Sequence, residues 1–211
     1  MRRSLVAAAL ASALCAGAAA QEKPRTPAEI AAKTETEATA AWRYRTAIAG
    51  LLQLKPGMVA AEIGTGTAFV ARTVASQVAP NGRVIAAALD RDMAAYVAER
   101  AKSEGIQNLS TLVVKADGAG LEPASLDAVA IVSAFGDFTA RPEMLRSVAA
   151  ALKPGGALVI VDLPAESAGS RVVGIDADDV VRLASAAGFT REAESTVVPG
   201  HYAIRFRKPT A

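Results

Sequence analysis

The chain has 211 residues, a length that predicts a single domain. Hydrophobic residues make up 52% of it and charged residues 21%, a composition that excludes an intrinsically disordered chain. The formal charge is +2, from 23 Lys and Arg against 21 Asp and Glu, and no block of like charges occurs, so we expect no nucleic-acid partner. One Cys and one His exclude Cys/His zinc sites and disulfide frameworks, so no metal site is expected.

The first twenty residues have the pattern of a secretory signal peptide. Arg2 and Arg3 form the charged start, residues 5–20 carry no charge, and the small residues before Gln21 suit cleavage after Ala20. The uncharged run is too short to span about 30 Å of hydrocarbon as a helix. A retained anchor is therefore the weaker alternative, and no stable membrane anchor is expected after cleavage. We expect a periplasmic or secreted protein whose mature chain, without the two arginines, has no net charge.

A helical segment is expected over residues 21–53. Thr26 followed by Pro27 predicts a helix start, because threonine is a good N-cap and proline suits the first helical position. Apolar residues then recur at loose helical spacing over residues 38–52, and the Lys-Pro-Gly sequence of residues 55–57 ends that helix.

From residue 54 onward, apolar strands alternate with helices. Strands are expected at residues 58–63, 83–89, 109–115, 126–133 and 157–162, helices at 68–78, 91–103, 142–152 and 176–187, and a closing hairpin at 189–198 and 201–207. The strands are apolar on both faces, as a parallel sheet between two helical layers requires. The alternation predicts an α/β fold with a doubly wound, Rossmann-like sheet, and ligands bind such sheets at the carboxyl ends of the strands.

A glycine loop follows the first of these strands. Glu62 lies one residue before the end of the strand. Residues 64–67, which we call the glycine loop, read Gly-Thr-Gly-Thr before the next helix. Glycines at such a turn let a ligand approach the backbone closely. A dinucleotide fingerprint would need glycine where Phe69 stands, and no phosphate-binding P-loop sequence is present. An acidic residue before Gly-x-Gly is instead typical of enzymes that bind S-adenosylmethionine.

Residues 54–209 resemble the class I S-adenosylmethionine-dependent methyltransferases, in particular a group of exported bacterial members. The resemblance is carried by residues 54–59, the 62–67 stretch, 82–84, 92–93, 125–129, 152–162, 186–189 and 206–209. It implies a methyltransferase-like domain over residues 54–211, with a seven-stranded, mostly parallel sheet whose last strand is antiparallel between strands five and six. It also implies S-adenosylmethionine as cofactor and methyl transfer to an acceptor, a small molecule or a protein, that the sequence does not identify.

The resemblance also implies roles for single residues. Glu62, Gly64 and Gly66 match the motif that holds the methionine part of the cofactor. Asp117, after the third strand, matches the carboxylate that reads the adenine amino group, and Ser133 lies at the strand end that faces the reacting methyl. Each has a simpler interpretation as well, since the glycines can merely shape a turn and Asp117 can be a turn residue.

Two positions leave the function open. Ala88 stands where the family has an acid that accepts hydrogen bonds from the ribose, and an affinity loss of tenfold to a hundredfold is the usual consequence. Asp90 either replaces that acid or is the N-cap of helix 91–103.

Asp137 is the candidate catalytic residue for orienting or deprotonating an acceptor, or else a solvated loop aspartate. The alternative function is a non-catalytic binding protein with weakened or lost cofactor binding. His201, the one histidine, is expected to have a structural or a solvated role.

Overall fold

The computed structural model describes residues 25–167 and 173–210. The signal peptide predicted for residues 1–20, with its cleavage site, lies outside these ranges. Within them, no helix has both the length and the apolar character needed to cross a bilayer.

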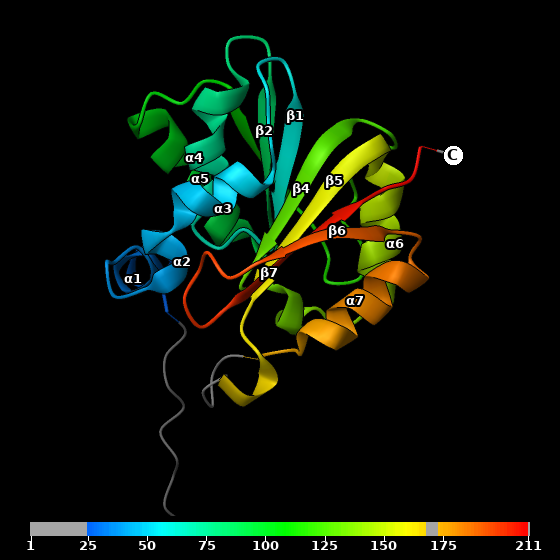
Figure 1. Ribbon diagram of the computed structural model, residues 1–211. Coiled ribbons are helices and arrows are strands. Elements are labelled where there is room, and N and C mark those ends of the chain that lie inside the picture. Colours follow the sequence, from blue (N-terminus) through cyan, green and yellow to red (C-terminus); the bar gives the residue numbers. More distant parts are fainter. Residues whose placement is uncertain (1–24, 168–172, 211) are drawn as a thin grey trace, which may run out of the picture.

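The core of the fold is one sheet of seven strands in the order β3-β2-β1-β4-β5-β7-β6 (Figure 1). The strands are β1 (Val59–Ile63), β2 (Arg83–Ala88), β3 (Leu109–Val113), β4 (Leu126–Val132), β5 (Leu152–Asp162), β6 (Thr190–Ser195) and β7 (Tyr202–Arg207). Strands β1 to β5 pair in parallel, and β7 is antiparallel to both β5 and β6. The predicted seven-stranded α/β architecture is therefore confirmed, including the antiparallel last strand.

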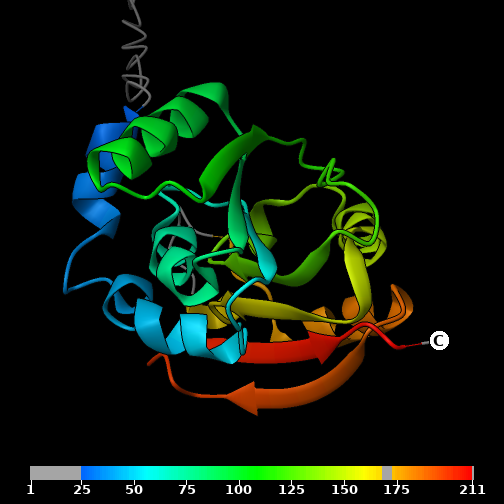
Figure 2. The same ribbon diagram turned by 90° about the horizontal axis from the view of Figure 1, so that it is seen from above.

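Helices cover both faces of the sheet. They are α1 (Pro27–Thr34), α2 (Ala40–Arg43), α3 (Arg45–Leu51), α4 (Phe69–Val78), α5 (Arg91–Ser103), α6 (Arg141–Ala151) and α7 (Ala177–Ala186), with short 3₁₀ turns η1 (Phe135–Asp137) and η2 (Ala165–Ser167). Helices α3 to α5 lie on one face and α6 and α7 on the other (Figure 1). Seen from above, β7 and β6 form one edge of the sheet (Figure 2).

The two faces of the sheet differ in side-chain size. Successive residues of a strand point to opposite faces, so a strand can place small side chains on one side and bulky ones on the other. The face under α3 to α5 carries many alanines: Ala86, Ala88, Ala128, Ala130, Ala157 and Ala203. The face under α6 and α7 carries larger groups: Ile63, Val129, Ile131, Leu158, Ile160, Ile204 and Phe206. Burial of these side chains supplies most of the stability of the domain.

The amino-terminal helices differ from the expectation. The helix begins after Thr26, whose side chain forms a capping box with Glu29, as an N-cap followed by proline predicts. The single helix expected over residues 38–52 is wrong, because the chain breaks at Tyr44 (φ −98°, ψ 15°) into α2 and α3. At the break the Arg45 guanidinium donates to the Trp42 carbonyl (2.8 Å).

Two strands also differ from the expectation. We expected every strand to be apolar on both faces, but β3 lies at one edge of the sheet and is only partly covered, with Val113 48% exposed. The Lys-Pro-Gly-Gly sequence of residues 153–156 does not separate α6 from the strand, since β5 begins at Leu152 and passes through it with a shift of register against β4. Gly155 allows this at φ +75°.

Candidate functional site at the carboxyl ends of the strands

The glycine loop joins the carboxyl end of β1 to α4. The N–H groups of Gly64 and Thr65 donate to the Ala87 carbonyl of β2 (2.9 and 3.3 Å), which fixes the start of the loop to the neighbouring strand. The backbone is left-handed at Gly64 (φ +68°), Gly66 (φ +47°) and Ala68 (φ +57°). The left-handed conformation costs an alanine about 1–2 kcal/mol, so the backbone is strained at Ala68, the N-cap of α4.

The two glycines of the loop have different surroundings. A Cβ at Gly64 would lie 2.6 Å from the Cβ of Ala134 and 3.3 Å from the ring of Phe138, so this glycine lets the loop pack against the chain that follows β4. A Cβ at Gly66 would meet no atom within 4 Å, and Gly66 is exposed. Gly64 therefore serves packing, whereas the backbone of Gly66 is open to a ligand.

Glu62 is buried beneath the loop. Its carboxylate accepts the backbone N–H of Ala71 in the first turn of α4 (2.7 Å). Burial raises the pKa of Glu62 to about 8, although the Ala71 N–H and the charge of Arg72 both act to lower it. In the folded chain the carboxyl group holds α4 on the sheet, and its predicted contact with the methionine part of a cofactor stays a prediction.

The carboxyl ends of β2 and β3 lie beside the loop. Ala88 is buried and offers no acceptor, while Asp90 is the N-cap of α5, with its Oδ1 accepting the Met93 N–H (2.7 Å). The capping interpretation of Asp90 is thus confirmed, and its second oxygen, Oδ2, is not the capping atom. Leu89 and Val113, at the ends of these two strands, are the exposed apolar side chains here.

Asp117 lies in a tight turn after β3. The turn is closed by a bridge between Lys115 and Gly118, and the Asp117 side chain is exposed. Asp117 is therefore a turn residue, as one of the two interpretations predicted. Its contact with adenine stays a prediction.

The chain that follows β4 holds the other predicted residues. Ser133 is exposed, has a left-handed backbone (φ +50°) and donates its N–H to the Val161 carbonyl (2.8 Å). Asp137 ends the η1 turn with an exposed side chain. Partial burial raises the pKa of Asp137, and the charge of Arg141 opposes this. Arg141 itself donates to the Phe135 carbonyl (3.1 Å) and to the Gly136 carbonyl.

Asp162, at the end of β5, is a residue of the site that the sequence analysis did not single out. Its buried carboxylate accepts the N–H groups of Phe135 (3.0 Å), Gly136 (3.4 Å) and Leu163 (2.8 Å). Burial raises its pKa, with the three N–H groups acting in the opposite direction. Asp162 thus fixes the η1 turn that presents Asp137. An acid at the end of a buried apolar strand was the signal that could have found it.

The side chains at this edge fit a cofactor with a polar end and an aromatic end. The buried hydroxyl of Thr67 has no hydrogen-bond partner within the described ranges, whereas the hydroxyl of Thr65 lies close enough to the Glu62 carboxyl group to lower its pKa. Both hydroxyls belong to the glycine loop, next to the exposed Gly66. Leu89 and Val113 offer apolar surface to an aromatic ring, and Asp90, the residue after Leu89, offers an acceptor.

A basic cavity lies at the opposite end of the strands. It has a volume of about 270 Å³ and is lined by Lys55, Lys153, Arg205 and Arg207 among others. Lys153 pairs with Asp127 (2.8 Å), and both arginines pair with Glu192. Because Lys153 and the two arginines are paired within the fold, we interpret this cavity as structural.

Known proteins resemble the chain over its central part. Residues 60–156, just under half of the chain, match a family described as the methyltransferase domain. The ubiquinone/menaquinone biosynthesis C-methyltransferase of Hydrogenovibrio crunogenus is 26% identical over 110 residues, which are 52% of this chain and 43% of that relative. The chain therefore matches less than half the length of this curated relative.

Solved structures show the same fold at low identity. A SAM-dependent methyltransferase from Aquifex aeolicus superimposes with a TM-score of 0.74 at 18% identity, covering 88% of this chain and 100% of that chain. The [4+2]-cyclase SpnF superimposes with a TM-score of 0.70 at 17% identity, covering 80% of this chain and 81% of that chain. These two names describe different activities. The fold therefore does not determine the reaction, which has to be inferred from the residues of the site.

The two glycines of the loop predict unequal effects of the same substitution. Gly64→Ala adds a steric conflict with Ala134 to the left-handed strain, so we expect it to lower the free energy of unfolding by more than about 2 kcal/mol. Gly66→Ala adds the strain alone, for a loss of about 1 kcal/mol. Urea unfolding followed by circular dichroism measures both. Equal losses would contradict the distinct packing of the two positions.

The buried Glu62 predicts a pH-dependent stability. Its pKa is raised from 4.5 to about 8. The folded state holds the proton more tightly, so this contribution is full below about pH 4.5 and is lost as the pH rises through about 8. Glu62→Gln cannot ionise and keeps an acceptor for the Ala71 N–H. Its free energy of unfolding relative to the wild type should therefore rise by a few kcal/mol from about pH 5 to pH 9. Urea titrations at several pH values measure this, and a constant difference would refute it.

Proposed function

We propose that this chain is an S-adenosylmethionine-dependent methyltransferase with its site at the carboxyl ends of β1 to β5. The observation that carries the proposal is the exposed, left-handed Gly66, open to a ligand at the end of β1. In the strand order 3-2-1-4-5-7-6, β1 and β4 flank the point where the order reverses, which is where α/β sheets bind ligands. The match of residues 60–156 to the methyltransferase domain and the named relatives support the cofactor.

Each part of the cofactor has a group in this chain that suits it. The Gly66 backbone and the hydroxyls of Thr65 and Thr67 would hold the methionine part, with Glu62 beneath them. Asp90 would accept hydrogen bonds from the ribose through the oxygen that does not cap α5. Leu89 would pack on the adenine. When bound, the cofactor supplies an electrophilic methyl group.

The acceptor side is formed by the chain after β4. Asp162 and Arg141 hold the η1 turn through its backbone, and the turn presents Asp137 at the surface. We infer that Asp137 orients an acceptor or takes its proton, which a raised pKa favours. The rest of the rate acceleration would come from proximity and orientation, which need no covalent residue. The acceptor is a small molecule or a protein.

A second candidate is a binding protein that has lost the reaction. The buried Ala88 favours it, because a methyl group replaces the acceptor for two ribose hydroxyls. The structural likeness to SpnF, which is named a cyclase, agrees with a fold whose activity varies. Saturable cofactor binding without methyl transfer to any acceptor class would favour this candidate.

We also propose that the protein is exported to the periplasm or secreted, as the exported bacterial group resembled by the sequence is. The charged start, the uncharged run and the small residues before Gln21 support this. Intact-mass measurement of the protein from periplasmic and medium fractions should give a chain that begins at Gln21. A chain recovered there that still begins at Met1 would refute cleavage.

Calorimetric titration with S-adenosylhomocysteine and S-adenosylmethionine tests the proposed function. The wild type should bind both, and absence of heat and of thermal shift at millimolar ligand would overturn the proposal. Asp90→Ser keeps an N-cap for α5 but loses the second oxygen, so affinity should fall tenfold to a hundredfold with little change in melting temperature.

Asp90→Ala is the matched comparison for that variant. It removes both the cap and the ribose acceptor, so it should lose a similar factor in affinity and also about 1 kcal/mol of stability. If the serine variant binds as tightly as the wild type, Asp90 is only a cap.

A further inference from the structure

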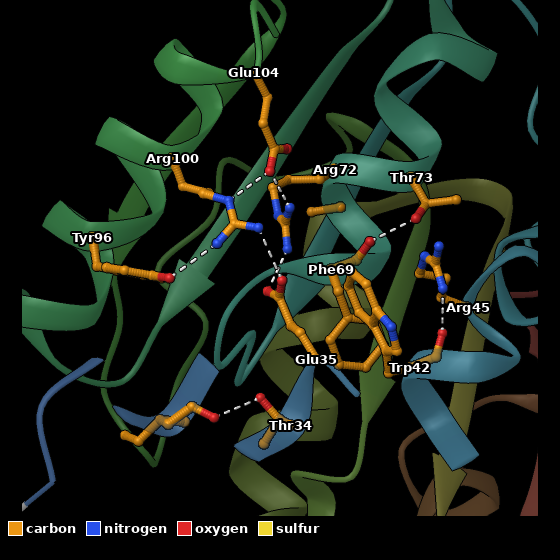
Figure 3. A network of polar contacts seen from close by, with 12 residues as sticks. Thr34, Glu35, Trp42, Arg45, Phe69, Arg72, Thr73, Tyr96, Arg100 and Glu104 are labelled. Atoms are coloured by element: carbon orange, nitrogen blue, oxygen red, sulfur yellow. Dashed lines mark hydrogen bonds and ion pairs between the residues drawn. The ribbon is translucent and has the colours of Figure 1, made fainter. Parts of the chain in front are cut away.

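Four charged side chains, from α4, from α5 and from the residues that follow α1 and α5, form a closed ring (Figure 3). Glu35, just after α1, accepts from Arg72 of α4 and from Arg100 of α5, the latter at 3.2 Å. Glu104, just after α5, accepts from the same two arginines at 2.6 Å each. Each arginine thus binds both carboxylates, and the Glu35 and Arg72 side chains are each only 7% exposed.

A second contact joins the same elements. Trp42 of α2 packs edge-on against Phe69, the first residue of α4, with ring centroids 5.9 Å apart. The guanidinium of Arg45 lies over the Trp42 ring at 4.0 Å, and that of Arg72 lies 6.0 Å from it. Figure 3 shows Trp42 and Phe69 side by side next to the charged ring. Glu35 and Trp42 therefore both contact the first turn of α4.

That turn is held on its two sides by different parts of the chain. Val70 and Ala71 are buried against the sheet, and the Ala71 N–H is bound by Glu62. Phe69 and Arg72, three residues apart, share the other side, as residues at this spacing do. Their partners on that side are Glu35, Trp42 and Glu104. Since the turn directly follows the glycine loop, its position fixes where the loop ends.

We propose that Glu35, Arg72 and Trp42 are positioning residues that couple the docking of α1 and α2 to the geometry of the glycine loop. The inference rests on the proposed function, because it assigns the loop to the cofactor. None of the three touches the cofactor in this scheme. They act by holding the first turn of α4, and with it the loop and Glu62, in the arrangement that binds.

The electrostatics of the turn agree with this coupling. The charge of Arg72 acts on Glu62 from within the same turn and lowers its pKa against the effect of burial. Glu35 and Glu104 bind both ends of the Arg72 guanidinium and so fix where that charge stands. The carboxylates facing Arg72 from the packed elements are therefore Glu35, Glu104 and Glu62.

Coupling between two events is reciprocal, and this allows a test that a purely structural contact would fail. If docking of α1 favours cofactor binding, then cofactor binding favours docking by the same factor. Hydrogen exchange of the backbone amides of residues 27–43 should therefore slow, about fivefold or more, when S-adenosylhomocysteine saturates the wild-type protein. This measurement needs no variant and does not depend on methyl transfer.

Glu35→Gln, with Glu37→Gln as its matched control, extends the test. Glu37 is two residues away, 78% exposed, and pairs only loosely with Arg43 (3.8 Å). We expect Glu35→Gln to speed exchange of residues 27–43 without ligand and to weaken S-adenosylhomocysteine binding by about 5- to 150-fold. Glu37→Gln should leave both quantities as in the wild type.

The outcomes separate the two proposals. No binding by the wild type would overturn the proposed function and the coupling with it. Wild-type binding without slower exchange in residues 27–43 would overturn the coupling and leave the proposed function standing. Unchanged ligand affinity in a folded Glu35→Gln would also overturn it. Should that variant not fold, the wild-type exchange measurement decides alone.

Discussion

The site depends on one buried hydrogen bond, between the Glu62 carboxyl group and the Ala71 N–H. Burying a carboxyl group is costly, and the raised pKa of Glu62 is the sign of that cost. The bond joins the end of β1 to the first turn of α4 across the glycine loop. With both ends of the loop fixed, the left-handed backbone at Gly64, Gly66 and Ala68 is held in place. A loop with one free end would relax from this conformation.

The same logic applies at β5. Asp162 is a second buried acid at a strand end, and it binds the N–H groups of Phe135 and Gly136 after the neighbouring β4. Gly136 has no room for a side chain, because the Val173 carbonyl lies where its Cβ would be. Each half of the carboxyl edge thus uses a buried carboxyl group to fix the loop beside it. The exposed residues Gly66 and Asp137 are held in position by the hydrogen bonds of Glu62 and Asp162, respectively.

The sequence predicted the features that follow from local patterns and did not predict those that depend on contacts between residues far apart in the chain. The alternation of strands and helices, the strand types and the position of the glycine loop follow from local patterns, and the structure confirms them. The break at Tyr44 and the partners of Glu62 were not predictable in this way. Neither was the ring, since Glu35 and Arg100 are 65 positions apart and meet only once three helices have packed. Asp90 shows the limit well, because one residue type fits both a helix cap and a ribose acceptor.

The loss of the acid at position 88 changes which element carries the ribose acceptor. Ala88 belongs to the row of alanines that lets the helices lie close on that face of the sheet, and it leaves no polar group there. The next side-chain acceptor along the chain is Asp90, which caps the first turn of α5 and is fixed to that helix. Arg100 of the same helix is bound into the ring with Arg72 of α4. The ring therefore joins α4 and α5, the two helices whose first turns border the site. An acceptor on a helix cap depends on the position of its helix, so it needs the support of the ring more than an acceptor on a central strand would.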